Sequence, residues 1–562
     1  MRRFSLIVVS LTMLLAASTA SAVPGHRAAW PSLDQQLRKD RVEAGTPLEK
    51  FIAANQDFQM LRPEEVNDKI PVPLWLRVAW RKDHPELTYS ADDPTGGYPH
   101  VLKEIHEWML SHQELRPDSA DRPTAPIDEA EGSGLSAISE ATTVGANTRV
   151  SGQQTVPRSE SDIRINFSNP LLVIASSNNI GGSGQQAQYY SSDGGATWGQ
   201  SFLPLVSTDN FHSDPTVDWT SDGTAWSTTI GIKGNTLKMR AYKSTNNGQT
   251  WTFDNTFSGT QKATDKEILW VDHSATSAFK DNLYVCWHNG LPAYVNRRTG
   301  PAGAWGTPIK VSGAESTGTA IGCDVKTNSS GDAFVFWPTT GNSKIVVAKS
   351  TNGGTSWGTP LVIATTFDSF DIGVPSFNSR RALIYVSAGA YRTALKNMVY
   401  ATWTDLTGAA GCTAPANEPG SNVGSTCKTR IWFSRSSDGG ATWSAPVMIN
   451  NQASLNDQFN QWMGVDDTTG RLAVIYYDTV GDPGRKKTDV WYQTSSDDGA
   501  TWSAATKLTT AQTDETVAGA DSGNQYGDYN GLSIFAGKIF PSWTDRRNNA
   551  KEEIWTVPIT EP

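Results

Sequence analysis

Basic residues and long apolar runs are both scarce in this chain of 562 residues. Lysine and arginine number 47 against 57 acidic residues, which gives a formal net charge of −10. Nucleic acid selects basic surfaces, so this balance argues against a nucleic-acid partner. The apolar stretch near the N-terminus is too short to span a bilayer comfortably, and no other apolar run reaches its length. Both observations argue against a transmembrane segment.

Several enzyme motifs are also missing. The sequence shows no nucleotide-binding loop, no nucleophilic-serine elbow and no zinc-protease helix. No acidic segment has the spacing of an EF-hand loop, although several carboxylates near the channel predicted below could hold Ca²⁺. We therefore expect no cofactor and leave metal binding open, with Ca²⁺ as the candidate ion.

Cysteine is rare, at four residues: Cys286, Cys323, Cys412 and Cys427. In an oxidising compartment this even count suggests two disulfides, for which three pairings exist. We favour Cys412 with Cys427, which closes a short loop, and therefore Cys286 with Cys323. The spacing fits no common zinc site.

The N-terminal part differs from the rest of the chain. Residues 1–22 resemble a secretory signal, with Arg2 and Arg3, an apolar run and a small-residue cleavage site. We therefore expect a secreted or periplasmic protein. Residues 23–116 carry helix signals such as Thr46-Pro47 with Glu49 and predict a small helical domain. Residues 117–145 are rich in Pro, Ser, Ala and acids and predict a linker.

An eight-residue pattern then occurs five times. It begins as "SSDGGATW" at 191–198 and has the form Ser-x-Asp/Asn-x-Gly-x-Thr/Ser-Trp. The Asp or Asn side chain can accept backbone N–H bonds inside a tight turn, and the glycine supplies a backbone geometry that other residues resist. The pattern predicts hairpin turns that end at Trp198, Trp251, Trp357, Trp443 and Trp502.

The spacing of these tryptophans predicts the fold. The step from Trp198 to Trp251 is 53 residues, and the step from Trp251 to Trp357 is 106, twice as long. A degraded member is therefore expected near Trp305. A period of about 50 residues made of short strands and Gly-rich turns is typical of a β-propeller, with one four-stranded blade per repeat.

The repeats resemble the Asp-box, or BNR, repeats of the sialidase-like β-propellers, over roughly residues 150–562. The resemblance implies an all-β propeller over 146–562 in which each box lies at an outer hairpin, remote from the ligand pocket. Seven extended stretches, opening near residues 162, 214, 265, 319, 371, 457 and 527, favour seven blades, with six as the alternative. The segment 147–152 could supply the outer strand of the last blade and so close the ring.

The starts of the innermost strands are polar and converge at one end of the channel. Their acids could bind the backbone of neighbouring blades, or they could form a ligand pocket. The resemblance implies catalytic roles for Asp214 as acid/base, Tyr529 as nucleophile and Glu267 as its activator. The substrate-binding candidates are Arg164, Asp265, Asp457, Asp528 and Arg546. The family's Arg-Ile-Pro motif is Arg164-Ile165-Asn166 in this chain.

Three functional hypotheses follow. The first is an exported glycoside hydrolase of the exo-sialidase type that acts on a carbohydrate or glycoconjugate. The second is a non-catalytic propeller that binds glycans or proteins. The third is that the N-terminal helical part covers the mouth of the channel. The sequence alone leaves open whether the protein is an enzyme.

Overall fold

The computed structural model describes residues 142–561 except 291, 314–319, 341 and 548–550. The predicted signal segment, the helical domain of 23–116 and nearly all of the linker lie outside the described residues. Within them the chain folds into strands, with one 3₁₀ turn at Pro415–Asn417. No helix in this described part is long and apolar enough to cross a membrane.

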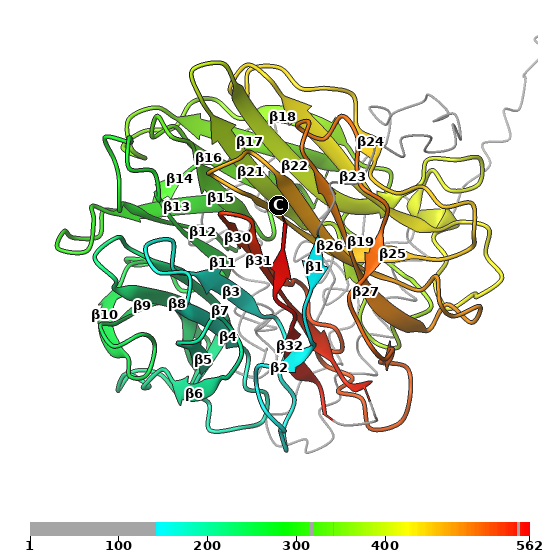
Figure 1. Cartoon of the computed structure of the whole chain (residues 1–562), viewed down its shortest axis with the longest axis horizontal. Coiled ribbons are helices and arrows are strands. Elements are labelled where there is room, and N and C mark those ends of the chain that lie inside the picture. Colours follow the sequence, from blue (N-terminus) through cyan, green and yellow to red (C-terminus); the bar gives the residue numbers. More distant parts are fainter. Residues whose placement is uncertain (1–141, 291, 314–319, 341, 548–550, 562) are drawn as a thin grey trace, which may run out of the picture.

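Seven antiparallel sheets surround a central channel, so the prediction of seven blades is confirmed and the six-bladed alternative is wrong (Figure 1). Blade 1 contains β3 (Asp162–Ile165), β4 (Val173–Ser177), β5 (Ala187–Ser191) and β6 (Gly199–Phe202). Blade 2 contains β7 (Phe211–Trp219), β8 (Ala225–Lys233), β9 (Thr236–Ser244) and β10 (Thr252–Thr256). Blade 3 contains β11 (Thr264–Val271), β12 (Leu283–Asn289), β13 (Ala293–Arg298) and β14 (Ile309–Lys310).

The next three blades repeat this order from the channel outwards. Blade 4 contains β15 (Asp324–Thr327), β16 (Ala333–Pro338), β17 (Lys344–Ser350) and β18 (Leu361–Thr365). Blade 5 contains β21 (Val386–Arg392), β22 (Asn397–Leu406), β23 (Thr429–Ser436) and β24 (Val447–Met448). Blade 6 contains β25 (Gln458–Val465), β26 (Leu472–Asp478), β27 (Lys487–Ser495) and β28 (Thr506–Lys507), and β29 (Thr513–Asp514) also pairs with β27.

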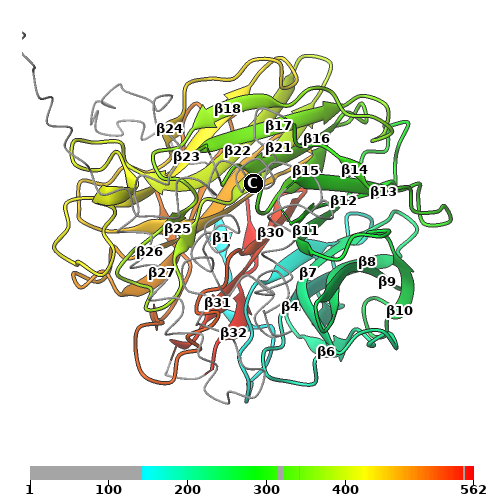
Figure 2. The same ribbon diagram turned by 180° about the vertical axis from the view of Figure 1, so that it is seen from behind.

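Blade 7 closes the ring with strands from both ends of the described chain. It contains β30 (Gly531–Phe535), β31 (Lys538–Asp545), β32 (Glu553–Thr556), β33 (Ile559–Thr560), β1 (Thr143–Val144) and β2 (Thr148–Arg149). Strand β2 pairs Thr148 with Thr556 and Arg149 with Trp555, so the predicted closure by segment 147–152 is confirmed. Figures 1 and 2 show β1 and β2, in cyan, against the red strands from the two sides of the ring.

The fifth unit corrects one expectation from the sequence. The stretch that opens at Asp371 is not the inner strand of blade 5, which is β21. Strands β19 (Asp371–Ile372) and β20 (Ala382–Leu383) form a separate two-stranded hairpin. The physical reason is an ion pair of 2.9 Å between Asp371 and Arg381, which holds this inserted hairpin together before the blade begins.

The repeated turns connect the third and fourth strands of blades 1, 2, 4, 5 and 6. In the first, the backbone N–H of Gly195 donates to Oγ of Ser191 at 2.9 Å and that of Thr197 donates to Oδ1 of Asp193 at 2.9 Å. The indole of Trp198 donates back to the carbonyl of Gly195 at 3.0 Å. The glycine has φ +84, a left-handed geometry that disfavours a side chain. Trp305 lies in the corresponding connection of blade 3, as predicted.

The strands are buried because each blade packs between two others. All seven residues of β26 are buried, including its polar ones. Between blades 2 and 3, for example, Ile230 and Met239 belong to one apolar cluster with Leu269 and Val285. Burying such side chains contributes about 1.5 to 3 kcal/mol each relative to exposing them. The propeller is therefore held together mainly by the apolar interfaces between its blades.

Both predicted disulfides are present. Cys286 on β12 bonds to Cys323, just before β15, and so links blades 3 and 4. Cys412 bonds to Cys427 within the long connection between β22 and β23. The second bridge closes a loop with a sequence separation of 15.

The repeated turns generate a prediction about acid stability. Hydrogen bonds from the hydroxyl and backbone N–H of Thr442 lower the pKa of Asp438 from its usual 3.8 to about 2. The stabilisation by this carboxylate is therefore complete above about pH 4 and is lost as the pH falls towards 2. Asp438→Ala removes the bonds from Thr442, so we expect it to lower the free energy of unfolding at pH 7. The loss should be only about 1 kcal/mol, because these bonds are exposed to solvent.

Asp438→Asn is the matched control, because asparagine fills the same place at Asn352. There its Oδ1 accepts the backbone N–H of Ser356, and its Nδ2 donates to the Ser356 hydroxyl. This variant should unfold like the parent protein at pH 7 and lose the dependence on pH between 4 and 2. Urea unfolding at both pH values measures this. Equal losses in the alanine and asparagine variants at pH 7 would contradict the assigned role.

Candidate functional site

Side chains of the inner strands bind the backbone of the next blade at five of the seven junctions and so help to set the inner strands in register. Oδ2 of Asp162 accepts the N–H of Val217 at 3.0 Å, and Oγ of Ser533 accepts that of Ile165 at 2.9 Å, which joins blade 7 to blade 1. Thr216, Asp218, Asp324 and Ser387 make the same kind of bond to the following blade. Asp162, Asp218 and Asp324 are therefore acids that join neighbouring blades, although they were not among the strand-start acids that the sequence singled out.

In this register one residue per blade stands at the end of the channel where the inner strands begin, here called the head end. These residues are Glu160, Asp214, Lys266, Gly322, Tyr385, Asn460 and Tyr529. Glu160, Asp214, Lys266 and Asn460 have φ between +47 and +56, which is strained for residues with a side chain. The register of β7, β11 and β25 shifts at these points. The head end is therefore built from bulges.

The three predicted catalytic residues meet here. Asp214 and Tyr529 are members of this ring, and Glu267 follows Lys266. Burial, followed by the charges of Asp214, Glu160 and Glu267, raises the pKa of Tyr529 well above its usual value. The ammonium of Lys266 lies 3.4 Å from the centre of the Tyr529 ring. Asp214, Glu267 and Tyr529 are each at most 1% exposed.

Most of the predicted substrate-binding residues are engaged in ion pairs. Asp457 binds Arg485 at 2.7 Å, Asp528 binds Arg380, and Arg546 lies 3.4 Å from Glu552. Asp265 lies 4.0 Å from His288. Arg164 also forms an ion pair, with Asp162 at 2.7 Å, but it lies deeper in the channel and lines a pocket at the opposite end.

That opposite end carries the repeated turns, and we call it the Asp-box end. Ile165, the last residue of β3, pairs with Val173, which pairs with Ser191 at the start of the first turn. A pocket opens here with about 600 Å³ of space, part of it open to solvent. Three residues that line this pocket are Arg164, Trp270 and Lys326. Each lies four positions after the head-end residue of its blade, in blades 1, 3 and 4. An adjoining hollow extends the pocket towards Arg392.

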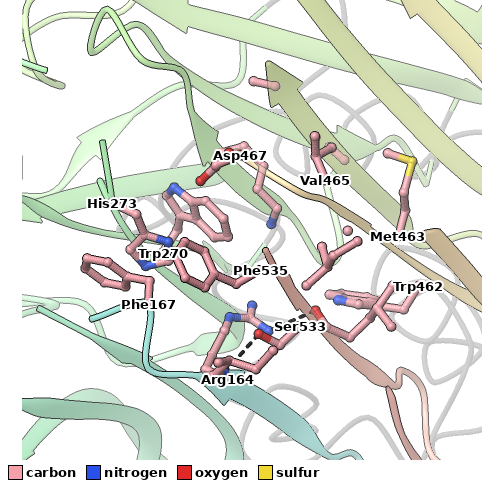
Figure 3. Close-up of a pocket in the computed structure, with 18 residues that line it drawn as sticks. Arg164, Phe167, Trp270, His273, Trp462, Met463, Val465, Asp467, Ser533 and Phe535 are labelled. Atoms are coloured by element: carbon pink, nitrogen blue, oxygen red, sulfur yellow. Dashed lines mark hydrogen bonds between the residues drawn. The ribbon is translucent and has the colours of Figure 1, made fainter. Parts of the chain in front are cut away.

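Aromatic rings form one wall of the pocket. The imidazole of His273 lies between Phe167 and Trp270, with ring centres 4.4 and 4.8 Å away, and Phe535 stands next to Phe167. Figure 3 shows these rings on one side, Trp462 and Met463 on the other, and Asp467 across from Arg164. The wall is half-buried, so part of each ring remains available to a ligand.

The pocket also contains charged groups with shifted pKa values. Burial opposes a charge on His273, but the Asp218 carboxylate at 2.8 Å outweighs it and raises the pKa of the imidazole. The side chain of Asp467 is exposed at the rim of the pocket. Desolvation by the neighbouring protein nevertheless raises the pKa of its carboxylate to about 6, against the attraction of His273. Burial lowers the pKa of Lys326, and Asp324 partly restores it.

Sequence reasoning missed most of this pocket. Lys326 could have been found, because "DIRI" at 162–165 and "DVKT" at 324–327 place a cation two residues after an aspartate in two different blades. His273 and Asp467 lie in the connections that follow inner strands, where no repeat pattern marks them. Among the described residues no three His, Cys, Asp or Glu side chains are grouped to hold a metal ion.

The surroundings of Arg546 generate a stability prediction. Its partner Glu552 neighbours Glu515, and both are fully buried. Burial and then the charge of Glu552 raise the pKa of Glu515 well above its usual 4.5. Stability from this group is therefore complete below about pH 4.5 and declines as the pH rises. We expect Glu515→Gln to raise the free energy of unfolding at pH 8 by about 1 kcal/mol or more.

Glu418→Gln is the control, since Glu418 is the ionised partner of Arg381 and its loss should destabilise the protein. Denaturant unfolding at pH 5 and pH 8 compares the two variants. A loss of stability in Glu515→Gln at pH 8 as large as that in Glu418→Gln would refute the assignment.

Comparison with known proteins gives one family match and distant structural similarities. The model of the BNR repeat-like domain matches residues 420–518. No curated protein matches the chain by sequence. A protein of unknown function from Dyadobacter fermentans is 12% identical, with a TM-score of 0.41, and the alignment covers 75% of this chain and 100% of that one.

Two other solved structures have named activities. The BP39L lectin from Burkholderia pseudomallei is 13% identical over 72% of this chain and 99% of that one, with a TM-score of 0.45. The NanB sialidase from Streptococcus pneumoniae is 12% identical over 60% of this chain and 68% of that one, with a TM-score of 0.37. The family match covers two of the five repeated turns, so this seven-bladed β-propeller contains BNR repeat-like sequence over residues 420–518.

Proposed function

We propose that this protein is an exported, sialidase-like BNR-repeat propeller that binds glycans at the Asp-box end of its channel. The observation that carries the proposal is the pocket itself, where half-buried aromatic rings stand beside Arg164, Lys326 and Asp467. Sugars present an apolar C–H face that packs on such rings, and their hydroxyl edges bond to charged side chains. A pocket with both features suits a carbohydrate better than a purely apolar ligand.

Two further observations support export. The N-terminal 22 residues have the pattern of a secretory signal, and the four cysteines form two disulfides. Disulfides form and persist in oxidising compartments. We therefore place the glycan partner outside the cytoplasm.

Glycoside hydrolysis at the head end is the second candidate function. It is favoured by the convergence of Asp214, Glu267 and Tyr529 from three blades. A nucleophilic tyrosine must reach the sugar and lose its proton. Tyr529 is buried and its raised pKa holds it as the neutral phenol, so binding ranks above catalysis.

The binding proposal predicts signals on a glycan array with the purified mature protein. Phe535→Ala should weaken binding about five- to ten-fold, because it removes one ring of the pocket wall. Phe202→Ala is the matched control, since this phenylalanine is 38% exposed on the outer strand of blade 1. An array without signals, or equal losses in the two variants, would remove the support for this site.

The catalytic candidate predicts release from a fluorogenic glycoside panel that includes an α-sialoside. Asp214→Asn and Tyr529→Phe should then fold normally and abolish the release. If the parent protein is silent on the panel yet binds the array, the protein is a binding propeller. Turnover that survives in both variants would exclude the assigned acid and nucleophile.

A further inference from the structure

We infer that the Asp-box pocket is an oxyanion site, in which Arg164 takes the carboxylate or sulfate group of an acidic sugar and Asp467 at the rim opposes it. This inference rests on the proposed glycan binding and names the class of glycan. It places the anion at the opposite end of the channel from Tyr529.

One edge of the Arg164 guanidinium is occupied and the other is available. Nη1 donates to Oδ1 of Asp162 at 2.7 Å, to the carbonyl of Ile163 at 2.8 Å and to that of Leu532 at 3.4 Å. Among the described residues, Nε is buried without an acceptor, the hydrogen bonds of the guanidinium all run through Nη1, and the side chain is 5% exposed. An unpaired guanidinium edge in a buried place is costly. This Nε–Nη2 edge has the geometry that binds two oxygens of a carboxylate or sulfate.

Two further cations stand around this edge. Lys326 holds its ammonium 4.7 Å from the centre of the Trp270 ring, and the guanidinium carbon of Arg164 lies 5.9 Å from the same ring. His273 stacks beside Trp270, and the pair with Asp218 favours its protonated form. All three cations line one pocket.

The acids that pair with these cations stand behind them and are already committed. Asp162, Asp218 and Asp324 each accept their own following N–H through Oδ1 and an N–H of the next blade through Oδ2. They therefore fix the three cations from the channel wall without closing the pocket. An incoming oxyanion approaches from the solvent side, where it meets the cations first.

Asp467 gives the site a dependence on pH. The charged groups in and around the pocket are Arg164, Lys326, His273 and Asp467, backed by Asp162, Asp218 and Asp324, with Asp272 and Asp466 near Asp467 and Arg392 in the adjoining hollow. As the pH falls through about 6, Asp467 loses its negative charge while the pair with Asp218 keeps His273 charged. The repulsion of an anionic ligand then falls, so affinity rises in acid.

The experiment titrates the protein with a glucuronic-acid disaccharide, a sulfated disaccharide and the neutral glucose counterpart, by calorimetry at pH 5 and pH 7.5. Inorganic sulfate is titrated separately. We expect the acidic ligands to bind at least about ten-fold more tightly than the neutral one. Affinity should be several-fold higher at pH 5. Arg164→Lys keeps the charge without the paired edge and should remove the preference for acidic ligands.

Asp467→Asn tests the site even if Arg164→Lys fails to fold, because Asp467 is exposed at the rim. It should raise the affinity for acidic ligands about five-fold at pH 7.5 and reduce the dependence on pH. Asp498→Asn is the matched control, since it removes an acid from the sixth-blade turn on the same face and asparagine tolerates its φ of +60.

The outcomes separate the two proposals. Equal binding of acidic and neutral disaccharides would overturn the oxyanion site and keep glycan binding. If no disaccharide binds but inorganic sulfate does, in an Arg164-dependent way, the oxyanion site stands and glycan binding is overturned. An Asp467→Asn variant that behaves like Asp498→Asn would overturn the assigned role of the rim acid.

Discussion

A buried carboxylate shared between two blades is the interaction on which this propeller depends. Asp162, Asp218 and Asp324 each bind the backbone of their own strand, the backbone of the next strand and one cation. A buried charge is tolerated only when it is paired and hydrogen-bonded, and these three acids meet both requirements. The cation is thus part of the joint between blades. Because the backbone bonds point along the ring, the cations are directed into the channel, and the device that joins the blades also builds the pocket.

The two ends of the channel differ because the layers of side chains between them differ. At the head end, charged and aromatic residues of blades 1, 2, 3, 5 and 7 are buried together, and Lys266 lies against Tyr529. Two layers further along, blades 5 and 6 contribute Gly389 and Gly464. A Cβ atom at Gly389 would stand 2.2 Å from Cγ2 of Val465, and one at Gly464 would stand 2.8 Å from Cγ2 of Ile534. These two positions require glycine, and the absence of side chains there leaves room beside Arg164 and Lys326. The Asp-box end consequently opens to solvent, whereas the named residues of the head end are buried.

The sequence predicted what local chemistry and a fixed period determine. The five turns, the seven blades, the closure by segment 147–152 and both disulfides follow from residues that act on near neighbours or repeat at one spacing. The sequence assigned the start at 371 wrongly because Asp371 and Arg381 form a hairpin whose acid-then-apolar pattern imitates an inner strand. The pocket was missed because His273 and Asp467 come together only when the ring closes. The family resemblance implied a site at the head end, with Arg164 in it. Arg164 instead lies four residues after Glu160, the head-end residue of blade 1, and so faces the other end of the channel.

The pKa values of Asp162 and Asp218 shift in opposite directions, and this difference bears on the pocket. Burial raises the pKa of Asp162 despite the attraction of Arg164. Burial acts on Asp218 in the same direction, but His273 and then Arg164 attract its charge and lower its pKa. Each carboxylate accepts two backbone N–H groups, one from its own strand and one from the next blade, so the difference comes from the neighbouring charges. Arg164 thus divides its attraction between two acids, one of which already pairs with His273. A guanidinium that bonds to Asp162 through Nη1 and attracts Asp218 through its charge still attracts a further anion to the edge that remains, because it is buried.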